Sequence, residues 1–287
     1  MTTPTPPTVL VGVDGSDASL AAADLGADEA VLHHCRLRLV GVLHRIDGAA
    51  MRTARSELDA AARRVSRRHP GLAVTTAVLV GMPGNVLVEE SARAELLVVG
   101  YRGRGGFAAV VGGAVHAQVA TSARCPVLVA RPEAPGAETA PEGPIVVGVD
   151  GSVHAARAVA FGFEEAARRG IPLVAVQVWS VPPHPPNGDP TRAATEAAAA
   201  ERQADAVVTA AVTGIRDEYP GVPVVTELIH GADVEETLVR RSAAASLTVV
   251  GSRGVGGVAG ALLGSVGHAL IHHAHSPVAI VRPAGDA

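Results

Sequence analysis

The sequence contains no lysine: all 24 basic residues among its 287 are arginine. A phosphate loop of the G-x4-G-K-S/T type requires a lysine, and so does Schiff-base chemistry, so both are excluded. Any phosphate site in this chain must therefore be built from backbone amides, hydroxyl groups and guanidinium groups.

Aromatic residues are scarce as well, at 2% of the chain against 48% apolar residues. The length favours two domains, and their cores must consist mainly of Ala, Val and Leu, which is typical of parallel sheets covered by helices. Residues 1–134 carry a net charge of +2 and residues 135–287 a net charge of −6, without a basic stripe in either half. With few aromatic residues and no basic stripe, we expect no nucleic-acid partner.

Cysteine is almost absent, and no apolar run is long. Cys35 and Cys125 lack CxxC or CxxH spacing, so we expect two buried, unpaired thiols in a reducing compartment. No apolar run approaches the roughly 18–20 residues that span a bilayer, and the N-terminal MTTPTPPT does not resemble a secretion signal. We therefore expect a cytoplasmic protein without a membrane partner.

The chain repeats itself. Three stretches return in the same order: residues 9–16 as 145–152, 96–103 as 247–254, and 125–132 as 276–283. A stretch rich in Pro, Glu, Gly and Ala separates the two copies. The repeat predicts a first domain over residues 1–134, a linker over 135–143 and a second domain over 144–287.

Each copy alternates short apolar runs with helical patterns. In the second copy the expected strands are residues 145–149, 173–179, 222–229, 247–250 and 277–281, and the expected helices are 152–170, 191–219, 233–241 and 265–273. The first copy follows the same plan with a shorter second helix. Such alternation predicts an α/β fold with two tandem, doubly wound, five-stranded parallel sheets, each binding its ligand beyond the carboxyl ends of its strands.

A glycine-rich loop follows the fourth strand of the second copy. Gly251 and Gly254 are followed, after nine intervening residues, by Gly264 and Ser265, where the last helix begins. Glycines allow positive φ and close approach to a phosphate, Ser265 is the expected N-cap, and Arg253 adds a charged contact. A plain surface loop with a helix cap is the alternative. The same spacing in both copies, between a strand and a helix, favours a phosphate site.

The first strand of each copy ends at an aspartate, Asp14 or Asp150. Asp150 is either a turn residue that helps Ser152 cap the next helix, or a carboxylate that accepts hydrogen bonds from ribose or adenine. The second strand ends at residues 177–179, where the backbone near Val178 could meet an adenine edge. We match Val178 with Leu43 of the first copy.

These motifs resemble the universal stress protein family in its tandem-domain, ATP-binding form, over nearly the whole chain. The resemblance implies a Rossmann-like fold of the adenine nucleotide alpha hydrolase type, with strand order 3-2-1-4-5 in each domain. It implies binding of ATP, with or without Mg²⁺, or of another adenine nucleotide. The implied second site, with Arg253 added, comprises Gly148, Asp150, Val178, Gly251, Arg253, Gly254, Gly264, Ser265 and Val266. The matching first site comprises Gly12, Asp14, Leu43, Gly100, Arg102, Gly103, Gly113, Ala114 and Val115. The resemblance also implies pairing of the fifth strands, residues 126–130 and 277–281, in a homodimer or in a pseudo-dimer within the chain.

Other constellations are weaker. His268 and His272 lie four residues apart on the last helix, but no third ligand is evident, so we expect no metal site. Motifs of the GxSxG or HExxH type are missing, and no second acidic residue is placed near a γ-phosphate, so we assign no catalytic residue. Three hypotheses remain: an ATP-binding regulator of a stress or dormancy response, which we favour, an interaction scaffold without a relevant nucleotide, and a slow ATPase.

The first copy has Ala114 where the second has Ser265, so its site is expected to bind nucleotide more weakly. One neutral hydrogen bond contributes on the order of 1 kcal/mol, or about fivefold in affinity. Ala114→Ser should therefore raise the nucleotide affinity of the first domain about fivefold in titration calorimetry. An unchanged affinity would show that the hydroxyl is irrelevant there.

Overall fold

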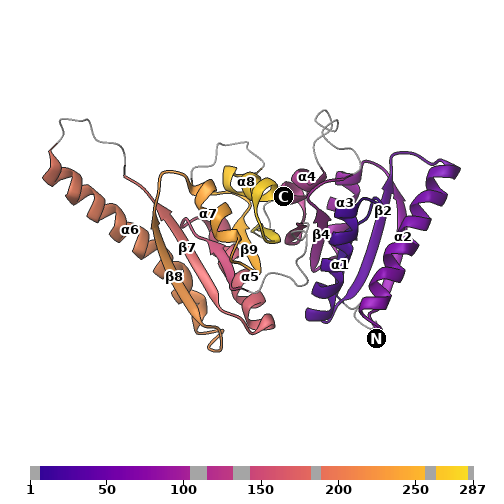
Figure 1. The fold of residues 1–287 in the computed structure, drawn as a ribbon, viewed down its shortest axis with the longest axis horizontal. Helices are drawn as coiled ribbons and strands as arrows, with labels where there is room; N and C mark the ends of the chain where they lie inside the picture. Colours follow the sequence, from indigo (N-terminus) through magenta and orange to yellow (C-terminus); the bar gives the residue numbers. More distant parts are fainter. Residues whose placement is uncertain (1–6, 104–114, 132–142, 182–188, 256–262, 284–287) are drawn as a thin grey trace. The chain divides into compact units, whose positions relative to one another are not determined.

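The computed structural model describes residues 7–103, 115–131, 143–181, 189–255 and 263–283 (Figure 1). It divides into two compact units, residues 1–138 together with 277–287, and residues 139–276. The elements of the first copy are β1 (Thr8–Gly12), α1 (Asp17–Leu32), β2 (Arg36–Leu43), α2 (Gly48–Arg68), β3 (Val74–Val80), α3 (Pro83–Ser91), β4 (Leu96–Gly100), α4 (Val115–Ser122) and β5 (Val127–Ala130). Those of the second copy are β6 (Ile145–Gly148), α5 (Val153–Arg169), β7 (Leu173–Trp179), α6 (Pro190–Arg216), β8 (Val224–His230), α7 (Val234–Ser242), β9 (Leu247–Gly251), α8 (Ser265–His273) and β10 (Val278–Val281).

The first unit is built on a sheet with the order β3-β2-β1-β4-β5, in which all neighbours are parallel. This is the expected order 3-2-1-4-5. Strand β10, although it comes from the second copy, belongs to this unit and runs antiparallel to β5, with Ala279 opposite Leu128. The β5 edge therefore carries a paired strand instead of exposed backbone groups.

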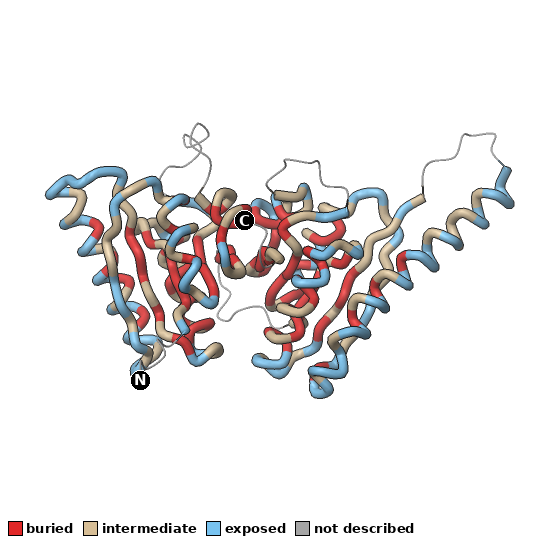
Figure 2. Tube along the Cα trace, turned by 180° about the vertical axis from the view of Figure 1, so that it is seen from behind, coloured by how far each residue is buried: buried red, intermediate tan, exposed pale blue. Residues whose placement is uncertain are grey.

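The second unit repeats the plan with the parallel order β8-β7-β6-β9. Its inner strands β6 and β9 are almost wholly buried, as expected of parallel strands covered on both faces. Figure 2 shows the buried residues gathered along the inner strands and the exposed residues along the outer helices. The expectation that the second helix is shorter in the first copy is confirmed, since α2 has 21 residues and α6 has 27.

Small residues set how closely the helices approach the sheets. A Cβ atom on Gly26 of α1 would lie 2.5 Å from Val11 Cγ2, and one on Gly162 of α5 would lie 2.5 Å from Val147 Cγ2. On the opposite face, a Cβ atom on Gly148 would lie 3.2 Å from Leu238 Cδ1 of α7. Neighbouring strand residues point to opposite faces of a sheet, so Val147 packs against α5 on one face and Gly148 packs against α7 on the other.

Most of the expected elements are confirmed. Helix α5 begins after Ser152, whose hydroxyl accepts a hydrogen bond from the Ala155 amide, and it ends at Gly170 with a φ of 66°. Strand β8 starts two residues later than expected, because the Val222 amide donates to the Tyr219 carbonyl in a turn. Helix α6 ends three residues earlier than expected, at Arg216.

Both cysteines lie among the described residues and form no disulfide there; Cys35 is buried and Cys125 is partly buried. Burial, reinforced by the charge of Glu95, raises the pKa of the Cys125 thiol to about 12, so it stays protonated and weakly reactive near neutral pH. None of the described helices has the length and apolarity needed to cross a bilayer.

The contact of Gly162 with Val147 can be tested by Gly162→Ala. The added methyl group would meet the stiff Val147 side chain at 2.5 Å, so overpacking should cost about 1–3 kcal/mol, offset by about 1 kcal/mol of helix propensity. Gly214→Ala in α6 is the matched control, because no described heavy atom lies within 4 Å of its new methyl group. In urea unfolding, Gly162→Ala should lower stability and Gly214→Ala should raise it slightly. Equal gains from both would contradict close packing of α5.

Candidate functional site

The candidate site of the second unit is organised by the carboxylate of Asp150, in the turn between β6 and α5. One carboxylate oxygen, Oδ1, accepts a hydrogen bond from the Ser152 amide at 2.9 Å. The other, Oδ2, accepts one from the Val255 amide of the glycine loop at 2.8 Å, although 105 residues separate the two in the sequence. Asp150 therefore has the turn-forming role that the sequence suggested, and it also joins that turn to the glycine loop.

Gly254 lies against the same carboxylate. A Cβ atom on Gly254 would stand 2.5 Å from Asp150 Oδ2, so a side chain here would displace the carboxylate. The expectation that the loop glycines adopt positive φ is wrong for the described residues. The positive φ in this region belongs to Gly151, at 83°, whereas Gly264 has a φ of −67° and neither Gly251 nor Gly254 is left-handed.

Gly251, the last residue of β9, is required by helix packing. A Cβ atom there would lie 2.7 Å from the backbone carbon and Cβ of His154 in the first turn of α5. The equivalent Gly100 stands in the same relation to Ala18, whose carbonyl oxygen would be 2.7 Å away. The first glycine of each loop thus lets the helix after the first strand approach the end of the fourth strand.

The C-terminal end of the glycine loop contacts its N-terminal end. The Gly264 amide donates to the Ser252 carbonyl at 2.9 Å, and a Cβ atom on Gly264 would lie 3.6 Å from Arg253 Cα. Gly264, not Ser265, is the N-cap of α8, so the expectation for Ser265 is wrong: it is the exposed first residue of the helix. No described side chain caps this helix, whereas Ser152 caps α5 and Asp233 caps α7.

The structure therefore brings most of the expected residues of the second site together. Asp150, Arg253, Gly254 and Gly264 surround the base of the glycine loop, Gly148 ends the neighbouring strand, and Val266 follows Ser265 in the first turn of α8. Val178 lies on β7, two residues beyond Val176, which is the register partner of Gly148. Its side chain lies beside Gly231, 3.9 Å from where a Cβ atom of that glycine would stand.

The match between Val178 and Leu43 is wrong by one residue. In the first unit Gly12 pairs with Val40, and in the second Gly148 pairs with Val176, so the counterpart of Val178 is Val42. Leu43 corresponds instead to Trp179. A shift of one residue turns a strand side chain to the other face of the sheet, and flanking sequence alone did not fix this register.

The first unit keeps part of the arrangement. Asp14 Oδ1 accepts hydrogen bonds from the amide and hydroxyl of Ser16, and a Cβ atom on Gly103 would lie 2.8 Å from Asp14 Oδ2. Gly113 and Ala114 lie outside the described residues, and Val115 is the first residue of α4.

Tyr101 and Arg102 follow the fourth strand of this unit, and Arg131 follows the fifth. The guanidinium carbons of Arg102 and Arg131 lie 5.2 and 5.1 Å from the centre of the Tyr101 ring. Burial lowers the pKa of the Arg131 guanidinium; the interaction with Tyr101 opposes this effect, and the positive charge of Arg102 adds to it. Besides Arg102, which we expected to supply a guanidinium group here, Arg131 therefore places a second one beside Tyr101.

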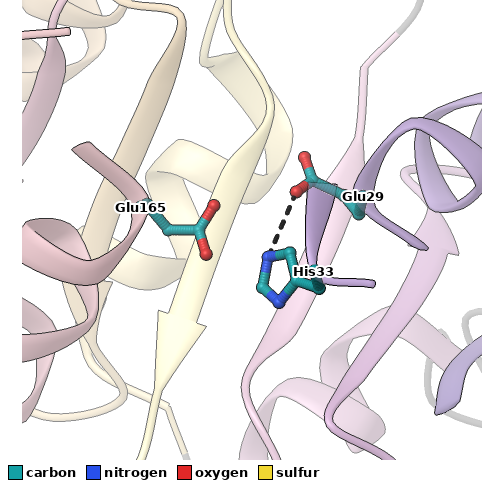
Figure 3. Close-up of side chains that lie close together, drawn as sticks. All are labelled: Glu29, His33 and Glu165. Carbon is teal, nitrogen blue, oxygen red and sulfur yellow. Dashed lines mark ion pairs between the residues drawn. The ribbon is translucent and has the colours of Figure 1, made fainter. Parts of the chain in front are cut away.

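Acidic and basic side chains contact one another at the ends of α1 and α5, outside the glycine loops. Glu29 and His33 of α1 are 3.5 Å apart, as the dashed line in Figure 3 marks. On α5, Glu165 pairs with Arg169 at 2.8 Å and with Arg168 at 3.3 Å. These pairs lie one helical turn apart within one helix each, the spacing at which opposite charges stabilise a helix end.

Sequence reasoning missed one pair next to the loop. His154 Nδ1 lies 3.0 Å from Ser252 Oγ, and both side chains are buried. The equivalent positions of the first copy hold Ala18 and Tyr101. The signal was present in the repeat, because both positions of the pair differ between the two copies.

The link between Asp150 and the loop can be tested by Asp150→Asn. Asparagine offers one carbonyl oxygen and an amide group that would face one of the two backbone amides, so the bond to Val255 should weaken. A charge-assisted hydrogen bond contributes about 1.5–3 kcal/mol, so hydrogen exchange at the Val255 amide should quicken about tenfold or more. Asp233→Asn, which alters a carboxylate cap on α7, should leave Val255 unchanged. Unaltered exchange in Asp150→Asn would show that the carboxylate does not hold the loop.

Comparison with known proteins identifies the family of this chain. The model of the universal stress protein family matches the chain twice, over residues 7–131 and 143–282. A universal stress protein of Mycobacterium tuberculosis is 33% identical over 293 residues, covering 96% of each chain. A solved universal stress protein of Archaeoglobus fulgidus, 18% identical, covers 98% of this chain and 97% of its own with a TM-score of 0.67, and so shares the fold. A universal stress protein solved in complex with cAMP is 30% identical and covers 44% of this chain, with a TM-score of 0.38. The chain belongs to the universal stress protein family and carries the family's domain twice.

Proposed function

We propose that the second unit binds an adenine nucleotide, ATP, over its glycine loop, and that the protein acts as a nucleotide-dependent regulator of a stress response. The observation that carries this proposal is the start of α8. Its first-turn amides have no described side-chain cap, and its N-cap, Gly264, packs against Arg253 and Gly254. Free amides at a helix N-terminus, together with a guanidinium group, favour a phosphate group.

Each expected residue then has a role in holding the ligand. Arg253 and the amides of Ser265 and Val266 would contact the phosphates, and Gly254 would leave room for them. Asp150 would keep the loop in place and offer its remaining lone pairs to a ribose hydroxyl. The backbone near Val178 would meet the adenine edge, and Mg²⁺ bound with ATP would help to neutralise the phosphate charge.

The first unit would hold a second, weaker site. Asp14 and Gly103 repeat the contact of Asp150 and Gly254, and Arg102 supplies charge. Ala114 takes the place of Ser265, so one hydroxyl is lost there. We propose sites of unequal strength on that basis.

The geometry favours holding ATP over hydrolysing it. Phosphoryl transfer needs a group that orients the attacking water and metal ligands that converge on the γ-phosphate. Both carboxylate oxygens of Asp150 accept backbone hydrogen bonds, which suits a structural carboxylate better than a catalytic one. Regulation would arise because ATP binds the ordered loop more tightly than a disordered one, and a ligand shifts an equilibrium only by its differential affinity.

We further propose that the pairing of β5 with β10 represents the domain pairing implied by the family resemblance, as a pseudo-dimer within one chain or in a homodimer, and that the protein works in the cytoplasm. The antiparallel register, with Val278 opposite Val129 and Ile280 opposite Val127, supports this reading. Analytical ultracentrifugation across a range of concentrations separates the two arrangements.

Gly264→Asp tests the phosphate site directly. The backbone at Gly264, with φ −67° and ψ 157°, accepts any residue, and its Cβ atom would meet only ordinary contacts. The new carboxylate would cap α8 and stabilise the protein by about 1 kcal/mol, but it would occupy the amides and repel phosphate. Affinity for ATP in titration calorimetry should fall at least about tenfold while thermal stability rises. Gly264→Ala is the control that adds bulk without charge.

Co-purified nucleotide provides the second measurement. Denatured protein should release material with adenine absorbance, and added ATP at about 100 times Kd should stabilise the parent by about 2.7 kcal/mol. If no nucleotide is released and ATP leaves the melting temperature unchanged, the protein is a scaffold without a nucleotide. Turnover above background that disappears in Asp150→Ala would instead identify an ATPase.

A further inference from the structure

The buried pair of His154 and Ser252 lies at the junction of α5, β9 and the glycine loop. His154 is the second residue of α5, and its Nδ1 atom is 3.0 Å from Ser252 Oγ. Ser252 directly follows Gly251, the last residue of β9. The exposed fractions of the two side chains are 9% and 1%, so water cannot readily replace either partner.

The pair is linked to both ends of the glycine loop. The carbonyl oxygen of Ser252 accepts the hydrogen bond from the Gly264 amide at 2.9 Å, which fixes the residue before α8. Arg253 follows Ser252 in the chain. A side-chain contact that holds Ser252 in place therefore also fixes the position of the Arg253 backbone and of the residue at which α8 begins.

The first unit does not have this histidine–serine pair at the equivalent positions. Ala18 and Tyr101 occupy the equivalent positions, and Ala18 has no side-chain polar atom. The Tyr101 ring instead has the guanidinium groups of both Arg102 and Arg131 near it. The polar link between the helix and the loop thus belongs to the second unit and distinguishes the two sites.

We propose that His154 is a positioning residue for the nucleotide site of the second unit. By holding Ser252, it holds the Ser252 carbonyl against the Gly264 amide, and so presents Arg253 and the first-turn amides of α8 in one arrangement before the ligand arrives. A site ordered in advance loses less conformational freedom on binding and therefore binds more tightly. The inference rests on the proposed nucleotide binding and adds to Ser265 a second residue that strengthens the second site relative to the first.

A double-mutant cycle on the full chain tests the proposal. His154→Ala and Ser252→Ala should each lower ATP affinity about tenfold in titration calorimetry, and the double variant should be no weaker than either single variant, because all three lose the same hydrogen bond. His154→Asn should retain affinity within about twofold, because its amide reaches the place of Nδ1. Independent, additive losses, or an Asn variant as weak as the Ala variant, would overturn the proposal.

Thr248→Val supplies the matched control. Thr248 also lies on β9 and shares a buried hydroxyl contact of 2.9 Å, with Ser276, but at the start of the strand, away from the loop. It should lower the urea midpoint as a lost buried hydrogen bond does and leave ATP affinity unchanged. A loss of ATP affinity equal to that of Ser252→Ala would mean that any weakening of β9 disturbs the site, and would overturn a specific role for His154.

Hydrogen exchange without nucleotide separates this inference from the proposed function. In His154→Ala and Ser252→Ala, exchange at the Gly264 amide should quicken about tenfold, and in His154→Asn and Thr248→Val it should match the parent. If the parent binds no ATP but exchange follows this pattern, the proposed function fails while the positioning contact stands. If the parent binds ATP and exchange at Gly264 is the same in all variants, the positioning role fails.

Discussion

The glycine loop of the second unit depends on the Asp150 carboxylate, which accepts backbone hydrogen bonds from two segments more than 100 residues apart in sequence. Because that carboxylate fills the space beside Gly254, the loop can pass only where its residue lacks a side chain. Gly251 is required by the first turn of α5 in the same way. The glycines of this motif are therefore required by packing within the protein, and the space that they leave for a ligand is a consequence of that packing.

The helices of the second unit differ in whether a side chain caps their N-termini. Ser152, Asp189 and Asp233 cap α5, α6 and α7 with side-chain oxygens, whereas α8 begins at Gly264 without a described side-chain cap. An uncapped helix keeps its first-turn amides available and costs some stability. In this unit the helix that lacks a described side-chain cap, α8, is the one that follows the glycine loop. The absence of lysine from the whole chain leaves these amides and Arg253 as the means of holding a phosphate.

The two copies share a fold but have diverged around their loops. The aspartate–glycine contact recurs in both, with Asp14 beside Gly103 and Asp150 beside Gly254. Beyond it, the second copy has a buried histidine–serine pair, while the first has a tyrosine ring close to two guanidinium groups. A tandem chain can change one site while the other keeps its function. The order of the first four strands is the same in both copies.

The sequence by itself determined the repeat, the alternation of strands and helices, and the place of the glycine loop between a strand and a helix, because these depend on local periodicity and spacing. Only the tertiary structure shows which atoms a side chain at each glycine would meet. It also places Ser265 inside α8 and shows that Val42, not Leu43, corresponds to Val178. It also decided the contact of His154 with Ser252, 98 residues apart. A hydrogen bond over that separation leaves no periodic trace in the chain, because the folded sheet alone brings its partners together.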